Sequence, residues 1–192
     1  MKRKLILASA SPRRQELLAQ LGLQFEVSIP SVPESKGRDP IMAAEQAALS
    51  KASEIAGKIE DAVVIGADTV VVVDDEILGK PRSASEAVKM LKKLSGRTHR
   101  VITGMAVVDS TGRRVVGHDI TFVVFRSLSE EEIRAYVDSG EGLDKAGSYG
   151  IQGLGALFIP RIEGSYSNVV GLPLAKLDEM LKHFGISILT RR

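Results

Sequence analysis

Short apolar runs alternate with helix-length segments along most of the chain. β-Branched runs indicate strands at 5–9, 63–73, 76–78, 99–108 and 115–125. Segments with helical start and stop signals occupy 13–21, 40–56, 84–94, 130–137 and 173–184. This alternation predicts an α/β or α+β fold in which helices flank a mixed β-sheet.

The predicted helix boundaries follow from capping residues. Two helices begin with an N-cap residue followed by proline, and two begin with a capping box. The proline starts are Ser11-Pro12 and Asp39-Pro40, and the boxes are Ser83 with Glu86 and Ser129 with Glu132. A length of 192 residues then suits one domain or two intimate lobes.

The composition is that of an ordinary globular protein and excludes several kinds of binding partner and of catalytic or metal site. The net charge of +2 is too small to indicate nucleic-acid or membrane binding, and the absence of cysteine removes disulfides, zinc–thiolate sites and thiol nucleophiles. The apolar run at 5–8 is too short for a signal peptide, and that at 70–73 is far short of a membrane span. We therefore expect a cytoplasmic protein with neither nucleic acid nor membrane as a partner.

The first candidate for chemistry is the turn from Ser9 through Ser11 and Pro12 to Arg13 and Arg14. The free N–H groups at a helix start suit a phosphate, which points to Ser11 and the arginines as phosphate ligands. Cations in the first helical turn oppose the helix dipole, so the two arginines indicate a bound anion. The alternative is a pair of solvated arginines on a surface helix.

The second candidate is Asp68, followed by Thr69, inside an otherwise apolar strand. A carboxylate there is costly unless it is paired or binds a metal ion, and it can orient a water for attack on phosphorus. The alternative is an aspartate at a bulge, bonded to the backbone. Lys51 and Lys80 are weaker candidates, because a lone lysine is usually exposed.

The third candidate is the segment 144–153, which combines charge, small residues and a carboxamide. Eight of the 18 glycines fall between 140 and 171, and such density often marks close approach of backbone to a ligand. Gln152 can donate and accept hydrogen bonds together and so can recognise a base edge, while Tyr149 is expected to wall the pocket. The alternative is a structural glycine-rich turn. His99 and the phenylalanines 122, 125 and 158 are expected to be structural.

The motifs together resemble the Maf family of nucleotide pyrophosphatases along essentially the whole chain. The matching segments are 7–14, 66–69, 79–81, 94–96, 144–153, 164–166 and 170–173. The resemblance implies a single domain over 1–192 with two lobes around one cleft. It also implies a fold like that of inosine triphosphate pyrophosphatases, an elongated mixed sheet flanked by helices.

The resemblance further implies hydrolysis of dTTP and UTP to the monophosphate and pyrophosphate, with Mg²⁺ or Mn²⁺ and a homodimeric assembly. Asp68 would be proton acceptor and metal ligand, and Glu34 a second metal ligand. The specificity positions fall on Arg13, Thr69 and Gln152. The phosphate ligands would be Ser11, Arg14, Lys51, Lys80 and Lys145.

Three alternatives remain at this level. The sister branch acting on 7-methyl-GTP carries a tryptophan near the arginines, whereas this chain has none. Nucleotidyl transfer would use the same acid, metal and cations. A division-linked protein that senses nucleotides, with incidental catalysis, is the third.

Overall fold

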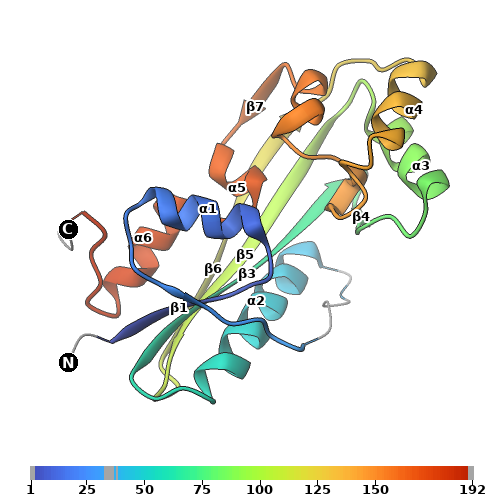
Figure 1. Cartoon of the computed structure of the whole chain (residues 1–192). Helices are drawn as coiled ribbons and strands as arrows, with labels where there is room; N and C mark the ends of the chain where they lie inside the picture. The colour runs from blue at the N-terminus through green and yellow to red at the C-terminus, as the bar shows by residue number, and fades with distance from the viewer. Residues whose placement is uncertain (1–2, 33–36, 38, 190–192) are drawn as a thin grey trace. The chain divides into compact units, whose positions relative to one another are not determined.

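The computed structural model describes residues 3–32, 37 and 39–189 and has the predicted mixed α/β architecture. Its seven-stranded sheet has the order β2-β1-β3-β5-β6-β7, with β4 paired to β3 (Figure 1). The strands are β1 (Lys4–Ala8), β2 (Glu26–Val27), β3 (Ala62–Val73), β4 (Glu76–Leu78), β5 (Thr98–Asp109), β6 (Arg114–Val124) and β7 (Arg161–Glu163). The helices are α1 (Pro12–Gln20), α2 (Pro40–Ala56), α3 (Ala84–Leu94), α4 (Glu130–Asp138), α5 (Tyr166–Val170) and α6 (Leu174–Lys182), with 3₁₀ turns η1 (Ala146–Ser148) and η2 (Gly153–Phe158).

The chain forms two compact units. Unit 1 comprises Met1–Asp68, Thr103–Asp119 and Gly171–Arg192, and unit 2 comprises Thr69–Ile102 and Ile120–Val170. The strands β3, β5 and β6 each supply residues to both units.

Unit 1 has parallel strands with helices on both faces. β1 pairs in parallel with β2 and with β3, where Ala8 lies opposite Gly66. α2 covers one face, and α1 and α6 lie on the opposite side of the strands (Figure 1). The core under α2 is dominated by small residues: Ile6, Ala8, Ala48, Ala52, Ile55, Ala56, Ala62, Val64, Ala106 and Val108. Small side chains allow the helix to lie close to the sheet.

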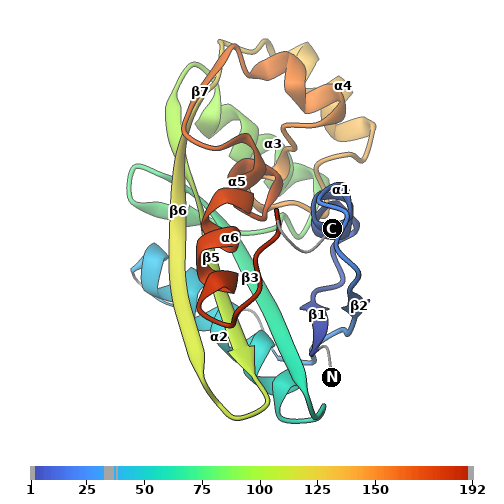
Figure 2. The ribbon, with the colours of Figure 1, turned by 90° about the vertical axis from the view of Figure 1, so that its left-hand side faces the viewer.

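Unit 2 has a larger, aromatic core. α3 and α4 lie side by side and pack over the strand ends, as Figures 1 and 2 both show. Phe125 and Phe158 are buried as predicted. The prediction for Phe122 is wrong, since it is 43% exposed. Strand alternation explains this, because Thr121 and Val123 on either side point inward.

The helix starts confirm most of the capping signals. The Asp39 side chain accepts hydrogen bonds from two N–H groups of α2, and Ser129 with Glu132 forms a complete capping box. The box predicted at Ser83 is only half formed, because the Glu86 carboxylate accepts from the N–H of Arg82 at 2.7 Å. Within the described ranges, no helix is long and apolar enough to cross a membrane.

Candidate active site

Asp68 forms a half-buried ion pair with Lys51 within unit 1. Alternation along β3 places Asp68 on the same face as Val64, which packs against α2. Lys51 follows Ala48 on α2 by nearly one turn, and its Nζ lies 2.5 Å from Asp68 Oδ1. The two side chains are only 15% and 17% exposed. The structure thus joins two residues whose sequence signals were unrelated.

Glycines on the strands set the distance between α2 and the sheet. A Cβ built on Gly66 would lie 2.2 Å from the carbonyl oxygen of Ala48. A Cβ on Gly104 would lie 2.2 Å from the carbonyl carbon of Ala44, one turn earlier on the same helix. Because backbone atoms cannot yield as a flexible side chain can, both positions require glycine. The Lys51–Asp68 contact depends on this close seating.

Arg14 is a partly buried cation bonded to backbone carbonyls, so the alternative interpretation of it as a solvated arginine is wrong. Its Nε donates to the carbonyl oxygen of Gly171 at 2.8 Å, and its Nη1 donates to the carbonyl oxygen of Ala67 at 2.9 Å. Burial lowers the pKa of Arg14, and the nearby carboxylate of Asp68 acts in the opposite direction. The guanidinium therefore lies in the electrostatic neighbourhood of Asp68 within unit 1.

Ser9 belongs to the predicted candidate turn, but no role was predicted for its side chain. Its Oγ is buried and accepts from Ser11 N at 3.2 Å and from Arg14 Nη1 at 3.3 Å. Ser11 is the N-cap of α1, yet its side chain makes no capping hydrogen bond. Arg13 is partly exposed in the first turn. A serine two positions before a serine-proline helix start was the available signal for Ser9.

In unit 2, Thr69 and Lys80 lie on either side of the β3–β4 hairpin. Thr69 is half-buried, whereas Lys80 is exposed after β4. Gly79 O accepts a hydrogen bond from Gly147 N at 3.0 Å, so the turn carrying Lys80 is tied to the glycine-rich segment. Gly147 has a φ of +68°, which favours glycine, and a Cβ there would lie tightly at 3.0 Å from Val71 Cγ1.

The glycine-rich segment itself holds Lys145 and Gln152 in different surroundings. Lys145 is largely buried and pairs with Asp144 Oδ1 at 2.6 Å, whereas Gln152 is exposed. Tyr149 is 5% exposed and lies in the aromatic core, with its hydroxyl 2.6 Å from His99 Nε2. The prediction that Tyr149 walls a pocket is therefore wrong. Its ring packs edge-on against Phe125, which holds it inside the unit.

Glu34, the predicted second metal ligand, lies outside the described residues. Within the described ranges, no cluster of three or more His, Cys, Asp or Glu side chains is arranged to hold a metal ion.

Unit 1 thus brings a half-buried carboxylate together with a lysine and an arginine on a mixed α/β sheet, an arrangement that is compatible with binding a polyanion such as a phosphate ester. The match to known families is specific. The chain belongs to the Maf family, whose description is Maf-like protein and which matches residues 4–184.

Curated relatives share about half of the sequence over nearly full length. One from Pelotomaculum thermopropionicum is 50% identical over 97% of this chain and 100% of its own. One from Moorella thermoacetica is 53% identical over 96% and 97%, and one from Vibrio cholerae serotype O1 is 51% identical over 94% and 98%. Each bears the name dTTP/UTP pyrophosphatase.

Among solved structures, the chain resembles a nucleoside-triphosphatase (dITP/XTP pyrophosphatase) from Mycobacterium abscessus. The TM-score is 0.48 and the identity 19%, over 94% of this chain and 97% of that one. No conclusion about activity follows from a likeness of this size.

Proposed function

We propose that this protein hydrolyses dTTP and UTP to the nucleoside monophosphate and pyrophosphate. The observation that carries the proposal is the Asp68–Lys51 pair in the neighbourhood of Arg14. A half-buried carboxylate paired with a lysine and close to an arginine could act as a base beside a bound polyphosphate. Relatives about 50% identical bear the name of this activity.

In the proposed reaction, Asp68 accepts a proton from the attacking water. The water oxygen forms a bond to phosphorus as the bond between the α-phosphorus and the bridging oxygen breaks, and pyrophosphate leaves. Lys51 fixes the carboxylate through its contact with Oδ1. Arg13, Arg14, Lys51, Lys80 and Lys145, with Ser11 at the start of α1, are assigned to the negative charge of the triphosphate.

A divalent cation, Mg²⁺ or Mn²⁺, fits this donor chemistry. Asp68 offers a hard carboxylate oxygen, and the described residues contain no cluster that would enclose an ion with protein ligands alone. Magnesium is commonly held by one or two carboxylates together with substrate phosphates and water. Asp68 and Glu34 would hold the ion, which would supply charge neutralisation at the phosphates.

Selection of the base is assigned to Arg13, Thr69 and Gln152. The exposed carboxamide of Gln152 can donate and accept at once, as the O4 and N3–H edge of thymine or uracil requires. A hydroxyl at Thr69 adds a donor or acceptor. We expect discrimination against purines to arise from the pattern of these polar groups.

A panel of triphosphates tests the proposal. The purified chain is incubated with dTTP, UTP, CTP, dATP, GTP and 7-methyl-GTP, with Mg²⁺ or Mn²⁺, and monophosphate and pyrophosphate are measured. We expect stoichiometric release from dTTP and UTP without any acceptor. Preference for 7-methyl-GTP would instead assign the sister branch, and a requirement for an acceptor nucleophile would assign nucleotidyl transfer.

The homodimer and the cytoplasmic location stay predictions. Light scattering coupled to size-exclusion chromatography tests the first against the 20.6 kDa mass of one chain.

A further inference from the structure

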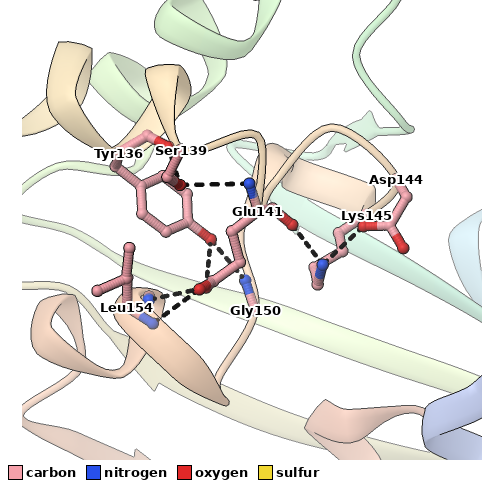
Figure 3. Close-up of polar contacts among 8 residues, drawn as sticks. Tyr136, Ser139, Glu141, Asp144, Lys145, Gly150 and Leu154 are labelled. Carbon is pink, nitrogen blue, oxygen red and sulfur yellow. Dashed lines mark hydrogen bonds and ion pairs between the residues drawn. The ribbon is translucent and has the colours of Figure 1, made fainter.

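Glu141 is the centre of a polar network in unit 2 that the proposed chemistry does not use (Figure 3). Its Oε2 accepts from Leu154 N at 2.8 Å, and its Oε1 accepts from Gly155 N at 3.0 Å. The Tyr136 hydroxyl, from α4, donates to the same Oε1 at 3.0 Å. One carboxylate therefore receives three hydrogen bonds from two segments of the unit.

Two of these donors are the first-turn amides of η2. Such amides have no partner within their own helix and need an acceptor from outside. The N-cap position of η2 is Gln152, whose side chain makes no capping hydrogen bond. Glu141, eleven positions earlier in the sequence, takes the role that an N-cap side chain ordinarily fills. The Gln152 carboxamide therefore does not need to cap η2 and can bind another group.

The network also fixes the opposite end of the segment that carries Gln152. Gly150 N donates to the Tyr136 hydroxyl at 3.3 Å, so the bonded pair Tyr136–Glu141 contacts residues on both sides of Gln152. A Cβ on Gly153, where φ is +69°, would lie 2.5 Å from Glu141 Oε2. The carboxylate is thus packed directly against the backbone next to Gln152.

The same residue contacts Lys145 through its backbone, because the Lys145 ammonium donates to the carbonyl oxygen of Glu141. The pKa of Glu141 is lowered. Burial acts to raise it, but hydrogen bonds from Gly155, Leu154 and Tyr136 and the charge of Lys145 act more strongly in the other direction. The group remains an acceptor across the neutral range.

We propose that Glu141 is a positioning residue for substrate selection, holding the backbone that presents Gln152 to the base. The inference rests on the proposed function, in which Gln152 recognises the pyrimidine. Glu141 itself touches neither the substrate nor the reacting atoms in this scheme. Its carboxylate fixes the position of the backbone from which the Gln152 side chain extends.

The variant Glu141→Gln tests this, with Glu131→Gln on the exposed face of α4 as the matched control. A carboxamide keeps one acceptor but turns an N–H₂ group toward a backbone donor, so one bond is lost. We expect KM for dTTP to rise about tenfold while kcat stays within about threefold, and the preference for dTTP over GTP to fall about tenfold. Tyr136→Phe, which keeps the carboxylate, should give a smaller change in the same direction.

Hydrogen exchange of the nucleotide-free protein gives a readout independent of turnover. The amides of Leu154 and Gly155 should exchange faster in Glu141→Gln than in the wild type, and unchanged exchange there would contradict the capping. A fall in kcat with unchanged KM and unchanged preference would overturn the selection role. If the wild type cleaves no pyrimidine triphosphate, the proposed function fails and the selection role with it, while exchange still tests the capping.

Discussion

The buried ring of His99 makes the stability of the protein depend on pH. His99 is 2% exposed, in edge-on contact with Phe125 and Tyr149. Its Nε2 meets the Tyr149 hydroxyl at 2.6 Å, and within the described part of the chain Nδ1 has no hydrogen-bond partner. A protonated ring would carry an N–H at Nδ1 with no acceptor. Burial accordingly lowers the pKa of His99 from 6.5 to about 4.

The sign and size of the effect follow from that shift. Because the folded pKa is depressed, the unfolded chain binds the proton more readily, and stability is lost as pH falls below 6.5 toward about 4. The full difference amounts to about 3 kcal/mol, since one pKa unit corresponds to about 1.4 kcal/mol. Between pH 7 and pH 5 the loss from this group is about 2 kcal/mol.

The perturbation is His99→Gln, which retains a group able to bond the Tyr149 hydroxyl but does not titrate. Urea unfolding, followed by circular dichroism at constant ionic strength, is measured at pH 7, 6 and 5 for both proteins. Glutamine will impose its own destabilisation at every pH. The quantity to compare is the free energy of unfolding of the wild type minus that of the variant, here called the wild-type advantage. It should shrink by about 2 kcal/mol from pH 7 to pH 5.

A wild-type advantage that stays constant over this range would refute the reasoning, because the ring would then gain a proton equally in both states. The matched control is His183→Gln, which removes an exposed histidine at the end of α6. That variant retains His99 and should therefore keep the loss of stability between pH 7 and pH 5.

Three further substitutions probe the candidate site. Asp68→Asn should lower kcat for dTTP at least about 100-fold while the protein stays folded. The control Asp75→Asn, on an exposed turn, should leave kcat unchanged. If Asp68→Asn retains most of its turnover, Asp68 is not the proton acceptor. Gly66→Ala should destabilise the protein by about 1–3 kcal/mol in urea unfolding and lower turnover, because the new methyl group collides with a carbonyl of α2. Gly57→Ala, which meets only ordinary contacts, is its control, and equal effects would contradict the close seating of α2. Arg14→Lys should cost about 1–3 kcal/mol in the same assay, because an ammonium cannot reproduce the planar set of donors; an unchanged urea midpoint would contradict the structural role.

Local signals predicted much of the fold. Capping residues and β-branched runs identified α2, α3, α4 and the long strands to within about two residues. The two-residue strand β2 and the short β7 were not predicted, because their pairing depends on β1 and β6 rather than on their own residues. Tertiary packing likewise determines that Phe122 is exposed and that Tyr149 is buried, and the identity of an aromatic residue does not reveal which face of the fold it occupies.

The site was predicted only as a set of separate residues. Asp68 stood out because a carboxylate is unusual in an apolar strand, whereas Lys51 looked like any lysine on a helix. Their pairing depends on how close α2 lies to β3, which Gly66 permits. Glu141 gave no signal, since its partners are backbone amides of a distant turn. A side chain that caps a turn more than ten residues away leaves no local pattern, unlike an N-cap residue at the start of its own helix.

The nesting of the two units along the chain has a consequence for synthesis on the ribosome. Unit 2 ends at Val170, but unit 1 also needs the segment from Gly171 onward, which supplies the carbonyl that receives Arg14 Nε and the buried Leu172, Leu177 and Leu181. When the nascent chain has emerged from the ribosome as far as residue 170, every segment of unit 2 is outside. Arg14 then still lacks the carbonyl oxygen of Gly171 as an acceptor. Unit 1, which carries Asp68, can therefore be completed only after the segment from Gly171 onward has emerged, later than unit 2.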